Sequence, residues 1–98
     1  MTGTGTGPLA VGRGVSFTIE LPATPTAGYR WQAASLPAGV TLDRSEFRSP
    51  AGAAAGGTAL QVLHFTATEP GLRRIDLVYQ RPWETEPAGH RSIHIQVQ

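Results

Sequence analysis

The sequence predicts an all-β fold, an immunoglobulin-like antiparallel sandwich of about seven or eight strands. Apolar and polar residues alternate with a period of two through most of the chain, as in strands with one buried face. The alternating runs are short and are separated by stretches rich in Pro and Gly, which is typical of a sandwich. No segment has the period of a helix, because glycines interrupt even the alanine-rich run 51–57.

The strands are expected where the alternation or the density of apolar residues is clearest. In chain order these runs cover residues 9–11, 15–21, 29–33, 40–47, 58–67, 75–79 and 93–97. The buried face of run 58–67 remains open, because Leu63, Phe65 and Ala67 lie on one side of it and Leu60 and Val62 on the other.

One tryptophan and both tyrosines lie in alternating runs, at the positions expected to point inward. Trp31 is the clearest of them, and we expect it in the core with no binding role. Tyr29 and Tyr79 are expected to share that core.

The composition fits one globular domain without covalent cross-links. The chain has 98 residues, of which 40% are hydrophobic and 15% charged, enough for a single core and too apolar for a disordered chain. It contains no cysteine, which excludes disulfides, thiol nucleophiles and cysteine metal sites. We expect one domain over residues 8–98, preceded by a flexible arm over residues 1–7.

Charge and hydropathy exclude several classes of partner. The net charge is +1 and no apolar run reaches membrane-spanning length, so we expect no nucleic-acid partner, no membrane partner and no cofactor. We expect a monomer. Residues 1–7 lack the basic and apolar regions of a signal peptide. The chain as given is therefore expected in the cytoplasm, or in the periplasm or outside the cell if a leader is missing from it.

The sequence gives no organised catalytic or metal site, so we predict that the chain is not an enzyme. His90 and His94 share a strand face, but at roughly 3.3 Å per residue they lie about 13 Å apart, too far to bind one metal ion. Nothing marks the residues that a triad or a carboxylate pair would need: Ser16, Asp76, Ser92, Glu84 and Glu86.

The connection expected over residues 22–29 has the sequence Thr24-Pro25-Thr26-Ala27-Gly28-Tyr29. Pro25 fixes its own φ and favours an extended Thr24, and Gly28 can adopt a positive φ before the next strand. Taken alone, these features predict only a turn between two strands.

Two later connections, over residues 50–58 and 81–89, also carry unusual residues. The first ends in Gly56-Gly57, which permits close approach of the backbone to another surface and, taken alone, predicts a flexible loop. The second opens with Arg81-Pro82-Trp83, and Trp and Arg are enriched in binding hot spots. Trp83 is expected either to project from this loop or to fold back onto the edge of the sandwich.

With these three motifs in this order, the sequence resembles the chagasin family of cysteine peptidase inhibitors. The family pattern is an Asn-Pro-Thr-Thr-Gly-(Tyr/Phe) loop, then a Gly-x-Gly-Gly loop, then an Arg-Pro-(Trp/Phe) loop. Trp31 follows the first motif and Tyr79 precedes the third, as the family pattern also has them. The likeness covers about residues 9–97, and three ordered motifs at strand ends are far more specific than one.

The resemblance implies a reversible, tight-binding inhibitor of papain-like cysteine peptidases that occludes the active-site cleft with three loops. The first loop would cover the peptidase's catalytic Cys-His pair, and the second would bond the non-primed side through its backbone. Trp83 would stack on the primed side, with Pro82 fixing its approach and Arg81 bracing the loop or pairing with an acid. The implied peptidase-binding residues are Thr24, Pro25, Thr26, Ala27, Gly28, Tyr29, Gly56, Gly57, Arg81, Pro82 and Trp83.

Three residues depart from the family pattern. Thr24 replaces Asn, Ala27 replaces the second Thr, and Ala54 replaces the first Gly of the second loop. We expect Thr24 to cap its loop less well than Asn would, and we expect the departures to alter potency and the choice of peptidase but not the fold. They also motivate the alternative of a non-inhibitory interaction or adhesion module on the same sandwich.

Overall fold

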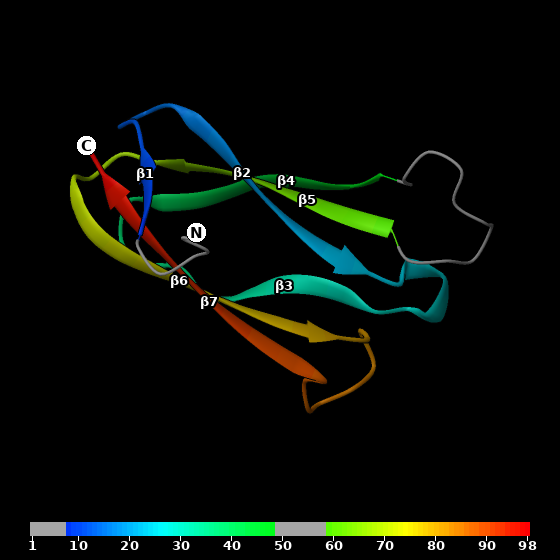
Figure 1. Ribbon diagram of the computed structural model, residues 1–98. Helices are drawn as coiled ribbons and strands as arrows, with labels where there is room; N and C mark the ends of the chain where they lie inside the picture. The colour runs from blue at the N-terminus through cyan, green and yellow to red at the C-terminus, as the bar shows by residue number, and fades with distance from the viewer. Residues whose placement is uncertain (1–7, 49–58) are drawn as a thin grey trace, which may run out of the picture.

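The structure, a computed structural model, describes residues 8–48 and 59–98, which form two packed β-sheets (Figure 1). This confirms the predicted sandwich, with seven strands in the described part of the chain. In chain order the elements are β1 (Leu9–Val11), β2 (Ser16–Ala23), the 3₁₀ turn η1 (Pro25–Ala27), β3 (Arg30–Ser35), β4 (Val40–Arg48), β5 (Ala59–Ala67), β6 (Gly71–Gln80) and β7 (Gly89–Val97).

The first sheet has the strand order β1-β7-β6-β3, and the second has β2-β5-β4. Every pairing is antiparallel except that of β1 with β7, which is parallel with Leu9 opposite Ile95. The expectation of a wholly antiparallel sandwich is wrong at this edge. No hairpin joins β1 to β7, so no tight turn dictates the direction in which β1 runs.

The core lies between the sheets and consists of the inward-facing residues of alternating runs. Leu63, Phe65 and Ala67 are completely buried, which settles the face of β5 that the sequence left open. Ile75 and Ile95 face them from the other sheet, also completely buried. Val62 is buried as well, but it lies on the opposite face of β5 and outside the main core cluster.

Several strands differ in length from the sequence prediction. β2 continues through Pro22 to Ala23, which an edge strand tolerates because one row of its N–H groups needs no partner. Val15 was expected in this strand, but it lies in a preceding turn and is 59% exposed. β6 and β7 both begin about four residues earlier than the apolar alternation indicated, because none of their first four residues is buried and most of them are polar.

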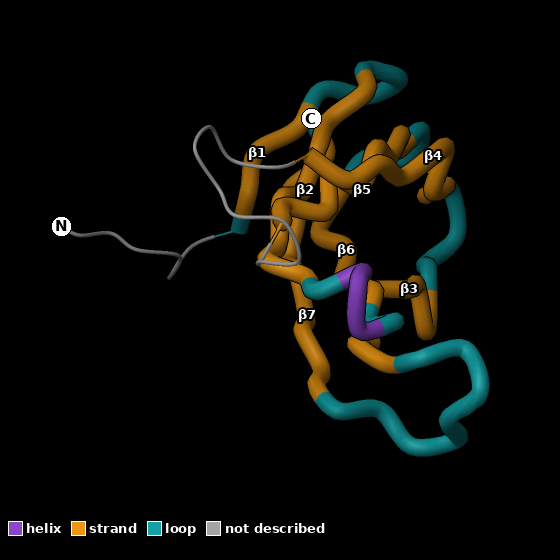
Figure 2. The backbone as a smooth tube through the Cα atoms, turned by 90° about the vertical axis from the view of Figure 1, so that its right-hand side faces the viewer, coloured by secondary structure: helices purple, strands orange, loops and turns teal. Residues whose placement is uncertain are grey.

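The first and third loops lie at the same end of the sandwich. The turn η1 and the β6–β7 connection lie at the right-hand end of Figure 1, where β4 ends and β5 begins. Figure 2 looks onto this end, with η1 beside the start of β3. The expected arm over residues 1–7, and the second loop with Ala54, Gly56 and Gly57, lie outside the described residues.

Candidate functional site

The first loop is a turn closed by its own backbone. The N–H groups of Ala27 and Tyr29 donate to the carbonyl of Thr24 at 3.0 and 3.2 Å, and the N–H of Gly28 donates to the carbonyl of Pro25 at 2.9 Å. Pro25 opens the 3₁₀ turn, and Gly28 ends it with φ +89°. Glycine adopts this left-handed conformation at little cost, so the loop has one defined shape.

Thr24 makes no side-chain cap bond to its own turn, in line with the weaker cap expected of Thr. Its side chain is used elsewhere. The Thr24 hydroxyl hydrogen-bonds the hydroxyl of Tyr79 at 2.9 Å, and the Thr24 N–H donates to the same Tyr79 oxygen at 2.9 Å. The first residue of the loop is therefore tied to β6 in the other sheet.

The third loop begins with a tight turn. The N–H of Glu84 donates to the carbonyl of Arg81 at 3.1 Å, which places Pro82 at the second position of a β-turn, where its fixed φ fits. The side-chain amide of Gln80 donates to the carbonyl of Glu84 at 2.9 Å and holds the turn against β6. Trp83 projects from this turn with 69% of its surface exposed. Glu84 is thus a turn residue, a role the sequence did not indicate.

A continuous stack of side chains joins the third loop to the core. Trp31 is buried in the core as predicted, and its ring lies 4.8 Å from that of Tyr79. Tyr79 stacks on Tyr29 at 5.2 Å, and the guanidinium of Arg81 lies 4.4 Å over the Tyr29 ring and 5.8 Å from the Trp83 ring. Tyr29 was expected in the core, but it stacks outside the core cluster. The exposed Trp83 is therefore braced from inside.

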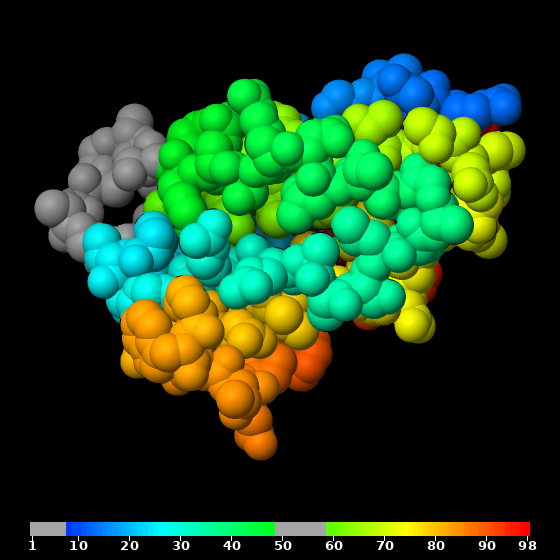
Figure 3. Space-filling model, turned by 180° about the vertical axis from the view of Figure 1, so that it is seen from behind, coloured from blue at the N-terminus to red at the C-terminus, as the bar shows by residue number. Residues whose placement is uncertain are grey.

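The first and third loops touch each other. A Cβ atom placed on Gly28 would lie only 3.0 Å from Cη2 of Trp83, so the indole packs against the bare backbone of the first loop. Figure 3 shows the two loops in contact at one end of the molecule, with the third loop (orange) projecting beside the first (cyan). Both alternatives for Trp83 thus hold in part, because the ring leans on the first loop and still exposes most of its surface.

Arg81 serves the stack rather than an ion pair. Within the described residues no carboxylate lies within ion-pair distance of its guanidinium, and its Nε is buried without a hydrogen-bond partner. Of the two roles that the resemblance implied for Arg81, these contacts fit bracing of the loop.

Residues of both loops line a shallow pocket, which also includes a residue that the sequence reading missed. Phe47, near the end of β4, is 41% exposed and lines this pocket. The other lining residues are Pro25, Gly28, Tyr29, Arg30, Pro82 and Trp83. Phe47 was treated only as the end of a strand, and nothing local in the sequence places it beside loops that are distant along the chain. A wider hollow around Leu9, Ile19 and Ile93 contains none of the expected site residues.

Comparison with known proteins decides the family. A sequence profile described as "Chagasin family peptidase inhibitor I42" matches residues 10–97. The chain belongs to the chagasin family of peptidase inhibitors. This confirms the resemblance seen in the three motifs, and it confirms that this chagasin-family chain is an inhibitor rather than an enzyme.

Solved structures share the fold of this chagasin-family protein. The crystal structure of the cysteine protease inhibitor EhICP2 from Entamoeba histolytica aligns with a TM-score of 0.74 at 23% identity, over 93% of this chain and 86% of the other. The solution structure of amebosin aligns with a TM-score of 0.71 at 28% identity, over 96% and 90% of the two chains. A comparison with curated protein sequences finds no match.

A fully buried glutamine supports the site of this chagasin-family protein from behind. Gln61 of β5 accepts the backbone N–H of Trp31 at 2.6 Å and donates to the Trp31 carbonyl at 2.8 Å. The indole N–H of Trp31 in turn donates to the carbonyl of Pro22 at 3.0 Å, at the start of the first loop. The sequence reading missed Gln61. The available signal was its inward-facing position on β5, which becomes visible only once the face of that strand is known.

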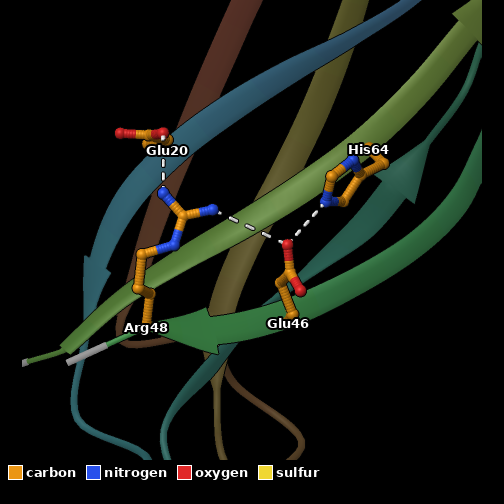
Figure 4. A network of polar contacts seen from close by, with 4 residues as sticks. All are labelled: Glu20, Glu46, Arg48 and His64. Atoms are coloured by element: carbon orange, nitrogen blue, oxygen red, sulfur yellow. Dashed lines mark hydrogen bonds and ion pairs between the residues drawn. The ribbon is translucent and has the colours of Figure 1, made fainter.

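A polar network lies on the outer face of the second sheet, at the strand end from which residues 49–58 depart (Figure 4). Glu46 hydrogen-bonds His64 at 2.9 Å and lies 3.7 Å from the guanidinium of Arg48, which reaches Glu20 at 3.9 Å. The hydrogen bond with His64 holds the pKa of Glu46 below its ordinary value.

The residues weighed for enzymatic or metal chemistry form no such site in the part of the chain that the structure describes. No group of three or more His, Asp or Glu residues there could hold a metal ion. The Ser92 hydroxyl donates to Asp76 at 2.8 Å, and Asp76 pairs with Arg74 at 3.2 Å on the exposed face of the first sheet. The first contact joins a cross-strand pair of β6 and β7, and the second joins two residues of β6, so both are surface contacts of the sheet.

Proposed function

We propose that this chain is a reversible, tight-binding inhibitor of papain-like cysteine peptidases, which occludes the active-site cleft with loops 22–29, 50–58 and 81–89. One observation carries the proposal beyond the family assignment. The first and third loops form a single edge, in which the indole of Trp83 rests on Gly28 and is braced by the stack through Arg81 and Tyr29. An edge of this kind fits a cleft.

The shape of the first loop supports occlusion without cleavage. A peptide bond is cleaved when its carbonyl sits in attack geometry. The carbonyls of Thr24 and Pro25 are instead turned into the loop, where they accept its backbone N–H groups. A loop held in this form fills space above the catalytic residues without presenting a substrate.

Preorganisation supports tight binding. Binding costs free energy when flexible loops must be ordered, and loops already fixed by Pro25, by Pro82 and by internal hydrogen bonds avoid much of that cost. Trp83 offers a large apolar surface that a cleft would desolvate, as hot-spot residues do. The contribution of Gly56 and Gly57 is part of the proposal, since the chain between β4 and β5 starts and finishes at the same end of the sandwich as the first and third loops.

We take residues 8–98 to act as one domain, with residues 1–7 as an arm. The family assignment favours inhibition, and no observation favours the non-inhibitory interaction module over it.

Titration of papain, and of a cathepsin L-like enzyme, with the purified chain and a fluorogenic substrate tests the proposal. We expect dose-dependent loss of activity that reverses on dilution and a competitive dependence on substrate concentration. Full activity of several papain-like peptidases at micromolar chain would contradict it.

A further inference from the structure

We propose that Tyr79 is a positioning residue for the inhibitory edge: its hydroxyl holds the first loop in register with the third and thereby sets the affinity for the peptidase. The inference rests on the proposed function. Nothing in the sequence motifs assigned Tyr79 such a role, since it was expected only to fill the core.

Tyr79 is anchored so firmly that its hydroxyl has a fixed position. It belongs to β6, and its ring is stacked between Trp31 at 4.8 Å and Tyr29 at 5.2 Å. The backbone of Trp31 is itself fixed by two hydrogen bonds with the buried Gln61, which accepts the Trp31 N–H and donates to the Trp31 carbonyl. The Tyr79 hydroxyl is therefore a rigid point at the surface of the core.

That rigid point holds the residue from which the first loop is built. The hydroxyl bonds both the N–H and the side-chain hydroxyl of Thr24, each at 2.9 Å. The Thr24 carbonyl then accepts the N–H groups of Ala27 and Tyr29, which define the turn. A shift of Thr24 would carry the whole loop with it.

The same residue also closes the third loop. The N–H of Ala88 donates to the backbone carbonyl of Tyr79 at 2.7 Å, where the chain returns toward β7. Tyr79 therefore contacts the first loop through its side chain and the third loop through its backbone. Because Trp83 packs on Gly28, the distance between the two loops must be kept for the edge to have one shape.

The pairing also gives Thr24 a function in this chain. Thr24 makes no cap bond to its own turn, so the loop is not fixed locally at its first side chain. The bond to Tyr79 supplies that restraint from the other sheet. Without the Tyr79 hydroxyl, the part-buried N–H of Thr24 would lose its hydrogen-bond partner, which carries a free-energy cost.

A double-mutant cycle on papain inhibition tests the inference. Tyr79→Phe keeps the ring stack and removes both hydrogen bonds, and we expect it to raise Ki about tenfold. Thr24→Val removes only the side-chain bond and is expected to raise Ki about threefold. In the Tyr79→Phe background, Thr24→Val should add nothing, and Thr24→Ser, which keeps the hydroxyl, should raise Ki less than Thr24→Val does.

A matched control separates positioning from stability. Ile95→Val trims a completely buried residue near the far end of β7, so it is expected to lower Tm while Ki stays at the wild-type value. Amide hydrogen exchange reports the loop directly, and the Thr24 N–H should exchange faster in Tyr79→Phe than in Ile95→Val. If Tyr79→Phe does not fold, the Ki of Thr24→Val decides the matter: a threefold rise that is smaller in Thr24→Ser supports the role, and equal Ki values for Thr24→Val and Thr24→Ser overturn it.

An unchanged Ki in Tyr79→Phe would overturn the positioning role, whether or not Thr24 exchange increases. Ki values that rise together with the loss of Tm in Ile95→Val would overturn it too. If the wild type inhibits no papain-like peptidase, the proposed function fails. Unchanged Thr24 exchange in Tyr79→Phe would then show separately that the hydroxyl does not restrain the loop.

Discussion

Gly28 is the residue where backbone conformation and contact between the loops coincide. Its φ of +89° lies in the left-handed region, which costs an L-residue about 1–2 kcal/mol. Its missing side chain also leaves the space that the indole of Trp83 occupies, because a Cβ there would lie 3.0 Å from Cη2.

Gly28→Ala should therefore weaken inhibition as well as stability. Gly14 provides the matched control, since its φ is +76° and a Cβ there would meet nothing within 4 Å. Both alanine variants should lose stability by about 1–2 kcal/mol in urea unfolding. Only Gly28→Ala should raise Ki for papain, because only there must the loop or the indole move. Equal Ki values for the two variants would contradict the packing of Trp83 on Gly28.

At single residues the sequence indicated conformation better than contact. The positive φ of Gly28 followed from a glycine before a strand, and the burial of Trp31 followed from its place in an alternating run. The contact of Gly28 with Trp83 and the bond between Thr24 and Tyr79 could not be predicted, because each joins residues far apart in the chain. Local preferences carry no information about such pairs until the sheet order is known.

At the scale of the strands, β3 lies at the edge of the first sheet, and the side chain of Gln61 from the second sheet hydrogen-bonds its backbone. The amide of Gln61 presents an acceptor and a donor to the N–H and carbonyl of Trp31, as a neighbouring strand would. The two sheets are thereby joined by hydrogen bonds directly behind the loops.

Gln61→Leu should remove both hydrogen bonds to the Trp31 backbone and destabilise the fold. Both Trp31 backbone groups would be left without their partner, at a cost of about 3 kcal/mol in the free energy of unfolding. For a chain of this size that corresponds to a fall in Tm of more than about 10 °C, measurable by calorimetry. Gln32→Leu makes the same change in β3, where the Gln32 side chain forms no hydrogen bond among the described residues, and its Tm should stay near the wild-type value. A Tm for Gln61→Leu as high as that of Gln32→Leu would show that the hydrogen bonds between Gln61 and Trp31 do not stabilise the fold.

The network at the end of β4 predicts a dependence of stability on pH. The lowered pKa of Glu46 means that the folded state binds a proton less readily than the unfolded state. Its contribution to stability is therefore complete above the ordinary glutamate pKa of 4.5 and is lost as the pH falls through the lower pKa of the folded state.

Glu46→Gln should accordingly be less stable than the wild type at pH 6, with a difference in Tm that shrinks as the pH falls below 4.5. Thermal scans across this range measure it. Glu69→Gln serves as the control, because Glu69 lies in a loop and pairs with Arg73 only at 3.7 Å. Equal Tm values for Glu46→Gln and the wild type at pH 6 would contradict the lowered pKa.

The existence of the strands was predictable from the sequence, whereas their ends and partners were not. Alternation identified most of the seven, because one face of the strand is buried, whereas β5 was identified by its density of apolar residues, since residues on both of its faces are buried. It failed at the polar beginnings of β6 and β7, where Arg73, Arg74, His90 and Arg91 carry no apolar signal although hydrogen bonding continues. It also gave no direction for β1, since a parallel edge strand has the same pattern as an antiparallel one.

At the scale of the whole molecule, the sandwich brings together two loops that are distant in the sequence and fixes both to one core. The three motifs predicted which residues gather, and the described loops confirm that the first and third lie side by side. Their order along the chain could not show that Trp83 rests on the first loop. The stack from Trp31 to Trp83 makes the exposed edge an extension of the core.

The most direct test of this account compares the Ki values of Trp83→Ala and Leu72→Ala against papain. Both residues are largely exposed, at 69% and 65%, but Leu72 lies near the start of β6, at the end away from the third loop. Trp83→Ala should weaken inhibition at least about thirtyfold with little change in Tm, and Leu72→Ala should leave both unchanged. Equal Ki values for the two variants and the wild type would contradict the claim that this edge occludes the peptidase cleft.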